Sequence, residues 1–139
     1  MTPAEAVQRC LSRYADFAGR AGQAEFWWFL LFVCVVCLVF SILDSALGFE
    51  PLWVAPRPPE FEPMFETRPS PLSGIAFLAL LCPLLAVGAR RLHDRGRDAF
   101  WLVALLLPIV GLVIVLGFCA LEGEPEENRF GPPPGRQGG

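Results

Sequence analysis

The sequence lacks lysine, has a single histidine, and carries no acidic or basic residue inside its long apolar runs. All eleven basic residues are arginine and the net charge is −3, so no broadly basic surface for nucleic acid is expected. Ionisable residues within membrane segments usually mark proton relays and ion paths; here Asp44 sits only at an outer end of the first span, which counts against a self-contained pump. A phosphate-binding glycine loop, a serine nucleophile elbow and a metalloprotease motif are also missing. No enzyme class is therefore indicated.

The cysteines do not form a pattern that predicts disulfides or a metal site. Their number is five, and four lie inside apolar runs: Cys34, Cys37, Cys82 and Cys119. An odd count in this placement argues against a secreted disulfide framework. Cys34 and Cys37 would share one helix face, but no histidine lies at that depth and no βαβ pattern accompanies them. We interpret them as small apolar side chains and expect neither a metal nor a cofactor.

What the sequence does contain is apolar residues gathered into blocks. Hydrophobic residues make up 54% of the 139 and charged residues 18%, which is typical of a membrane protein. We predict an all-α integral membrane three-helix bundle, preceded by a short interfacial amphipathic helix. Its parts are a cytoplasmic segment 1–25, a membrane domain 26–121 and a polar tail 122–139 rich in proline and glycine.

The predicted spans cover about residues 26–47, 72–89 and 99–121. The run from Phe26 to Leu43 would be about 27 Å long as a helix, close to the bilayer core of about 30 Å. Pro83 should kink the second span, which is the weakest. Pro108 and Gly111 should bend the third or allow close helix contact.

The segments around the spans carry capping and turn signals. Thr2, Pro3 and Glu5 predict the start of a helix over 2–17, which would lie either on the membrane surface or on the protein's own cytoplasmic face. Gly22 with Glu25 would cap the first span, and Asp98 the third. The acidic, proline-rich stretch 50–71 predicts an exposed loop without regular structure.

The distribution of arginine predicts the orientation. With three spans, one side holds Arg9, Arg13, Arg20, Arg90, Arg91, Arg95 and Arg97, and the other holds Arg57, Arg68, Arg129 and Arg136. The positive-inside rule then places the N-terminus and the connector 90–98 in the cytoplasm and the C-terminus outside.

The connector between the second and third spans is the most charge-dense segment. Its candidate contacts for lipid head groups or a partner are Arg90, Arg91, His93, Asp94, Arg95 and Arg97. The arginines would anchor the cytoplasmic end of the second span or hold anionic phosphates. An alternative would make His93 and Asp94 an acid–base or metal pair, but such sites normally recruit several further groups.

Three groups of residues together resemble a known family. They are Gly19-Arg20-Ala21 with Glu25-Phe26-Trp27-Trp28, then Arg90-Arg91-Leu92-His93-Asp94-Arg95-Gly96-Arg97, then Gly123 with Asn128-Arg129-Phe130-Gly131-Pro132. In this order they resemble the small bacterial inner-membrane proteins called domain of unknown function 805, over about 14–134. The resemblance implies a helical plasma-membrane protein and supplies no activity. Gly22 and Gln23 stand where such sequences often carry a hydroxyl or basic residue, and the 50–71 loop is longer than usual.

The leading functional hypothesis is a non-enzymatic multi-pass protein of a bacterial inner membrane, acting as an interaction or envelope component. Its expected partners are anionic lipid head groups, and a protein partner or a second copy of the chain. The alternatives are a subunit of a transport or channel assembly and, third, an enzyme that uses His93 and Asp94 on a lipid head group.

Overall fold

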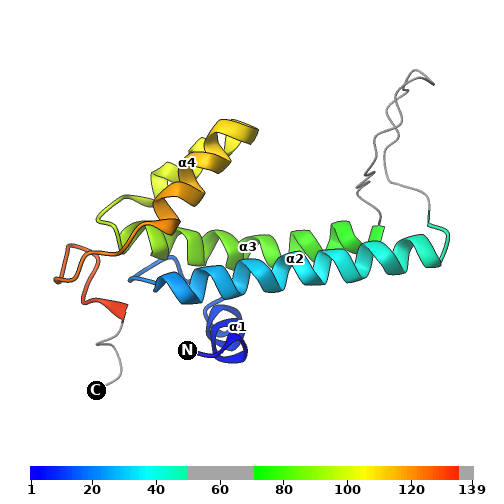
Figure 1. Ribbon diagram of the computed structural model, residues 1–139, viewed down its shortest axis with the longest axis horizontal. Helices are drawn as coiled ribbons and strands as arrows, with labels where there is room; N and C mark the ends of the chain where they lie inside the picture. The colour runs from blue at the N-terminus through cyan, green and yellow to red at the C-terminus, as the bar shows by residue number, and fades with distance from the viewer. Residues whose placement is uncertain (50–70, 135–139) are drawn as a thin grey trace. The chain divides into compact units, whose positions relative to one another are not determined.

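The structure, a computed structural model, describes residues 1–49 and 71–134. Its helices are α1 (Pro3–Ser12), α2 (Gln23–Ala46), α3 (Pro71–His93), the 3-10 helix η1 (Ala99–Leu106) and α4 (Pro108–Ala120) (Figure 1). Every regular element in these two ranges is a helix, which confirms the predicted all-α class. Two compact units divide the chain: the first takes 1–32 and 81–139, and the second 33–80. Most of the predicted loop 50–71 lies outside the described residues.

Helix α1 begins as the sequence predicts. The Thr2 hydroxyl accepts from the Glu5 amide at 3.3 Å, and the Glu5 carboxylate accepts from the Thr2 amide at 2.9 Å. The helix is shorter than the predicted 2–17, since it ends at Ser12. Its inner side chains, Ala6 and Cys10, are fully buried. Helix α1 therefore packs on the protein's own surface, which was one of the two predicted placements.

Helices α2 and α3 correspond to the first two predicted spans. Both are long and apolar enough to cross a membrane, with mean hydropathies of 2.8 and 2.3 over their most apolar stretches. Only 17% and 28% of those stretches are buried within the protein. A core helix of a water-soluble protein would bury most of such a surface, so this exposure favours a lipid environment.

The third apolar run is not the single helix predicted over 99–121. It forms η1 and α4, which are separated at Leu107 and contact one another. Trp101 near the start packs edge-on against Phe118 near the end, with ring centroids 5.1 Å apart. The chain therefore reverses direction and forms a helical hairpin, the η1–α4 hairpin, within the first unit (Figure 1). The predicted bundle of three spanning helices is not observed.

Proline and glycine explain the reversal. Pro108 brings no amide hydrogen and occupies the first position of α4. The Leu107 amide donates to the Ala104 carbonyl at 2.9 Å, and the Gly111 amide donates to the Leu107 carbonyl at 2.8 Å. A Cβ atom added to Gly111 would overlap the carbonyl of Ala104. A bend or a close helix contact was expected at Pro108 and Gly111. The structure has both, and the bend is a full reversal of the chain rather than a kink within one helix.

In the second unit, a carboxylate of α2 caps the start of α3. Asp44 is 1% exposed, and its two oxygens accept from the Leu72 amide at 3.2 Å and the Ser73 amide at 2.9 Å. Amides in the first turn of a helix have no partner within the helix, and the helix dipole favours a negative charge there. Asp44 therefore links two helices that the sequence separates by the long loop.

Replacing Asp44 with asparagine should lower the free energy of unfolding by about 0.5–2 kcal/mol, the range measured for lost helix caps. The amide keeps one acceptor oxygen but loses the negative charge and the second acceptor. Chemical unfolding in detergent, followed by circular dichroism, measures the change. The neighbouring exposed Ser45 supplies the control, since Ser45→Ala should leave the unfolding midpoint unchanged. Equal midpoints for both variants would contradict the capping role.

Candidate functional site

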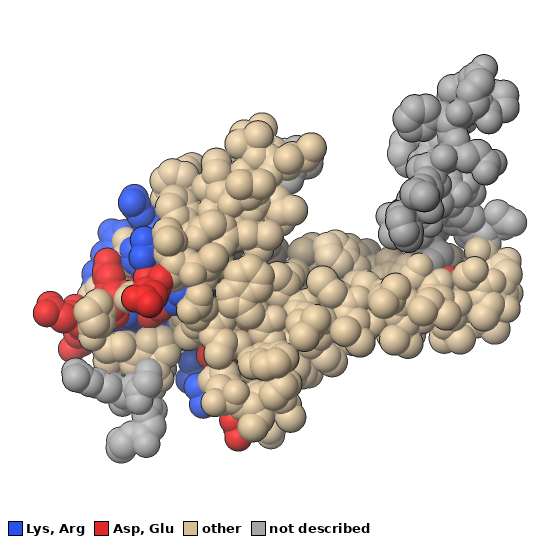
Figure 2. Space-filling model, viewed as in Figure 1, with Lys and Arg blue, Asp and Glu red and all other residues tan. Residues whose placement is uncertain are grey.

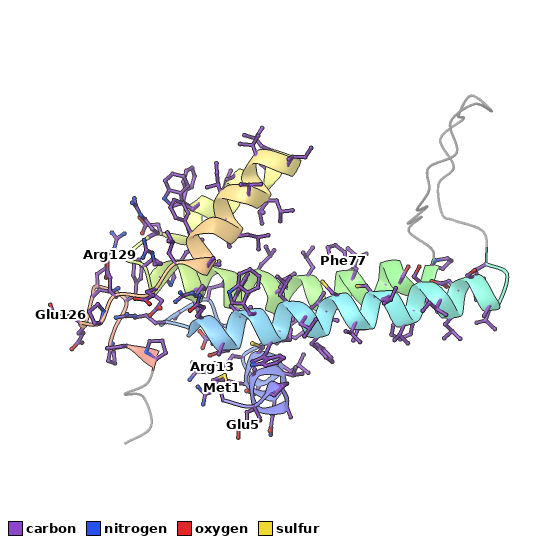
Figure 3. All side chains as sticks on the ribbon, in the orientation of Figure 1. Met1, Glu5, Arg13, Phe77, Glu126 and Arg129 are labelled. Atoms are coloured by element: carbon purple, nitrogen blue, oxygen red, sulfur yellow. The ribbon has the colours of Figure 1, made fainter. Side chains whose placement is uncertain are left out.

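Three polar segments that lie far apart in the sequence meet in the first unit. They are residues 19–25 before and at the start of α2, the connector 90–98, and the tail 121–131. We call this assembly the polar cap. Many charged side chains of the first unit gather around it, where Glu126 and Arg129 of the tail mark it, whereas Glu5 and Arg13 lie at α1 (Figures 2 and 3). The cap contains most residues of the three groups on which the family resemblance rests; Phe26, Trp27, Trp28 and Pro132 lie just outside it.

Asp94 is the centre of the polar cap and binds two buried arginines. One carboxylate oxygen accepts from Nε of Arg20 at 2.8 Å, and the other accepts from a terminal nitrogen of Arg91. The three residues are 3%, 1% and 1% exposed, respectively. Buried charges are tolerated when they are paired and fully hydrogen-bonded. Two guanidinium groups share one carboxylate here, so further acceptors are needed.

Backbone carbonyls at the end of α4 and in the tail supply those acceptors. Arg20 donates to the carbonyls of Glu124, Glu126 (2.7 Å) and Gly131 (3.2 Å). Arg91 donates through Nε to the Cys119 carbonyl at 3.1 Å and through a terminal nitrogen to the Leu121 carbonyl. Two buried side chains thus hold the end of α4 and the tail against the connector.

A second buried pair joins α2 to α3. The Glu25 carboxylate lies 3.0 Å from Nη1 of Arg90, and the Cys10 thiol of α1 lies 3.7 Å from the same carboxylate. Burial and the Glu25 charge raise the pKa of Cys10 to about 12, so this thiol is neutral. The pair is electrostatic, because none of the Arg90 nitrogens has a partner with hydrogen-bond geometry among the described residues. The Glu25 side chain, which was predicted to take part in a capping box at the start of the first span, therefore pairs with Arg90.

His93 belongs to the cap's internal packing. Its Nδ1 lies 3.2 Å from the Gly19 carbonyl, which can only accept, so this nitrogen carries the proton. Its ring stacks on Phe130 of the tail at 4.0 Å between centroids and 5° between planes. Burial lowers the pKa of His93, which keeps the stacked ring uncharged at neutral pH. The side chain is 8% exposed and orders the tail.

At two positions of the resemblance motifs, backbone conformation or lack of space explains why the residue is glycine. Gly96 has φ +64°, in the region that glycine adopts at little cost, and it ends the turn after α3. A Cβ at Gly123 would overlap the Asp94 carboxylate. The amide of the next residue, Glu124, donates to the Asp94 backbone carbonyl at 2.8 Å. The tail can approach Asp94 this closely because position 123 has no side chain.

The outer rim of the cap is exposed. Asp98 was predicted to cap the third span, but its side chain makes no capping hydrogen bond and instead pairs with Arg129 at 2.9 Å. These two side chains are 61% and 59% exposed. Arg97 is also exposed, with its guanidinium carbon 5.6 Å from the Phe118 ring centroid.

The six predicted contact residues therefore divide into two groups. Arg90, Arg91, His93 and Asp94 are buried in internal pairs, whereas Arg95 is half-buried and Arg97 exposed. The first four cannot serve as surface ligands for a head group while the cap is folded. Arg20, Glu25 and the tail carbonyls were not proposed as parts of a shared site, because no local pattern indicates which distant segments meet.

The cap also bears on the predicted orientation of the tail, through its described residues 121–134. The tail contacts both the segment before α2 and the connector, through Arg20 and through Asn128, whose side chain donates to the His93 carbonyl at 3.0 Å. Segments in direct contact cannot lie on opposite sides of a bilayer. The expectation of a tail outside and a connector inside is incompatible with these bonds.

Comparison with known proteins identifies the same region. A family model described as "Protein of unknown function (DUF805)" matches residues 14–132. The chain is 33% identical to the inner membrane protein YhaH of Escherichia coli K12 over 126 residues, covering 91% of this chain and 93% of that protein. It is 31% identical to the inner membrane protein YhaI of the same strain over 124 residues, covering 89% and 90%.

No solved structure matches this fold. The family match begins before Arg20 and ends just after Gly131, so it includes every residue of the polar cap. The motifs that indicated the family thus include Arg20, Arg91 and Asp94, which tie the connector to the tail. The chain belongs to the DUF805 family of proteins of unknown function.

Proposed function

We propose that the protein is a non-enzymatic, multi-pass component of a bacterial inner membrane, which contacts anionic lipid head groups through the exposed arginines around its polar cap. The inner-membrane location rests on the names of its relatives and on the lipid-facing exposure of α2 and α3. The polar cap is its cytoplasmic part. A protein partner or a second copy of the chain could use the same rim.

The observation that carries this proposal is the division of the ionisable groups. The groups with potential for catalysis, among them His93, Asp94 and Glu25, are buried in pairs that hold the fold together. Of the arginines outside these pairs, Arg9, Arg13 and Arg97 are exposed. An exposed arginine near an anionic leaflet contributes about 1 kcal/mol of attraction.

Replacing Arg9, Arg13 and Arg97 with glutamine should weaken binding of anionic lipid by about 100-fold, since three contributions of about 1 kcal/mol are lost. Binding is measured by native mass spectrometry of the purified protein, titrated with phosphatidylglycerol and with phosphatidylcholine. The fold should persist, because all three side chains lie outside the buried network.

The matched control carries three exposed charges of the opposite sign. Glu122→Gln, Glu126→Gln and Glu127→Gln together should leave anionic lipid binding equal or stronger. Equal affinity of the wild type for both lipids would contradict the head-group proposal. Solute flux by the reconstituted protein would instead support the transport alternative.

A further inference from the structure

The η1–α4 hairpin presents an apolar surface that the protein does not cover. No charged residue occurs from Ala99 to Leu121. Near the reversal, Leu106 is 80% exposed, Ile109 79% and Val113 66%. Figure 2 shows the surface over α4 as uncharged, in contrast to the cap beside it. Exposed apolar patches of this kind mark contact with a membrane or a partner.

Both ends of the hairpin are attached to the polar cap. At its start, Asp98 pairs with Arg129 of the tail at 2.9 Å. At its end, the Ala120 carbonyl accepts from the Gln23 side chain at 2.7 Å, and the Cys119 carbonyl accepts from Arg91. The chain therefore leaves the cap and returns to it.

The arms of the hairpin are too short to cross a bilayer. Eight residues of 3-10 helix rise about 16 Å, and thirteen residues of α-helix rise about 20 Å. The hydrocarbon core is about 30 Å thick. Each arm would reach a little beyond the middle of the core. One leaflet would then cover most of the apolar surface.

The amide and the carbonyl of Leu107, at the point of reversal, both have partners, which lowers the cost of placing them in the interior of a bilayer. The Leu107 amide and carbonyl are both hydrogen-bonded within the hairpin, and Pro108 has no amide hydrogen to leave unpaired. No polar side chain occurs from Leu105 to Leu116. The tip of the hairpin therefore brings neither a polar side chain nor an unpaired Leu107 backbone group into the hydrocarbon.

We propose that the η1–α4 hairpin is a re-entrant element, whose outer surface contacts the acyl chains of the leaflet on the side of the polar cap. The N-terminal segment, the connector and the tail then all lie on one side. This arrangement places nine of the eleven arginines together and leaves only Arg57 and Arg68 opposite. The positive-inside rule assigns the larger group to the cytoplasm. The three-span topology would instead divide the arginines seven to four, which is a weaker asymmetry than nine to two.

Reporter fusions to the full chain test this inference. Green fluorescent protein fused after Gly139 should fluoresce, and alkaline phosphatase at the same position should be inactive. Alkaline phosphatase inserted after Pro59, between α2 and α3, should be active and controls for the assay. An active phosphatase after Gly139 would show that residues 99–121 cross the membrane and would overturn the proposal.

A second measurement separates membrane insertion from docking in water. In a variant with the five native cysteines replaced by alanine, Leu107→Cys should stay unlabelled by a membrane-impermeant maleimide in both right-side-out and inverted vesicles. The exposed Ser12→Cys should be labelled in inverted vesicles only. Labelling of position 107 from either side would overturn the proposal. Both readouts are independent of head-group binding, so the proposed function can fail separately.

Discussion

Replacing Asp94 with asparagine is expected to release the C-terminal tail and lower the free energy of unfolding of the first unit by about 3–5 kcal/mol, the cost of breaking a buried ion pair. The carboxylate uses one oxygen for Arg20 and the other for Arg91. Asparagine keeps one acceptor, turns a donor toward the second arginine, and leaves both buried charges without a carboxylate in contact. Arg20 and Arg91 are each 1% exposed, so water cannot replace the lost carboxylate.

The measurement combines unfolding in detergent with limited proteolysis of the tail. Tail residues 122–131 should be cleaved much faster in Asp94→Asn than in the wild type, because Arg20 holds the carbonyls of Glu124, Glu126 and Gly131. Asp98→Asn, four residues away, is the matched control. Its pair with Arg129 is about 60% exposed on both sides, so its loss should cost at most about 1 kcal/mol. Equal destabilisation by the two substitutions would contradict the central role of Asp94.

The sequence predicted those features that depend on local chemistry. The start of α1 follows from Thr2 and Glu5, whose reciprocal hydrogen bonds involve only neighbouring residues. Helices α2 and α3 follow from long apolar runs, and α2 begins directly after Gly22, as the capping signal indicated. In each case the energy that decides the structure comes from adjacent residues or from the solvent, and either can be read from composition and spacing.

The third apolar run shows where such reasoning fails. Length and hydropathy fit a span over 99–121, but they contain no information on whether η1 can pack against α4. That contact depends on Gly111 lying against the Ala104 carbonyl, seven residues earlier. The sequence contained the signals, Pro108 and Gly111, but they are equally compatible with a bent helix. Only the tertiary contact separates a bend from a reversal.

The sequence analysis singled out many residues of the polar cap but did not predict that they lie together. The charged connector was correctly singled out, and the resemblance motifs contain Arg20, Asp94 and Gly123. Abundant arginine beside a predicted span favours a lipid-facing interpretation, because surface arginines are common there. The structure buries Arg90 and Arg91 because carboxylates and carbonyls from distant segments converge on them. Such convergence has no signature in the local sequence.

The hairpin predicts an effect of opposite sign at two glycines of α4. Gly111→Ala should lower the free energy of unfolding by about 1–2 kcal/mol, since overpacking costs about 1–3 kcal/mol and the helix gains up to about 1 kcal/mol. The overlap is with the backbone carbonyl of Ala104, which no side-chain rotation can relieve. Thermal unfolding in lipid nanodiscs, followed by tryptophan fluorescence, measures the change. Trp101 reports on this contact through its packing against Phe118.

Gly117→Ala is the matched control in the same helix. A Cβ at this position meets no atom within 4 Å, so only the gain in helix propensity remains, and stability should rise by up to about 1 kcal/mol. If residues 99–121 formed one straight spanning helix, Ala104 and Gly111 would lie about two turns apart on it, about 10 Å along its axis. Both substitutions would then stabilise the protein alike. Opposite signs at the two glycines therefore distinguish the reversed hairpin from the single span, independently of any topology reporter.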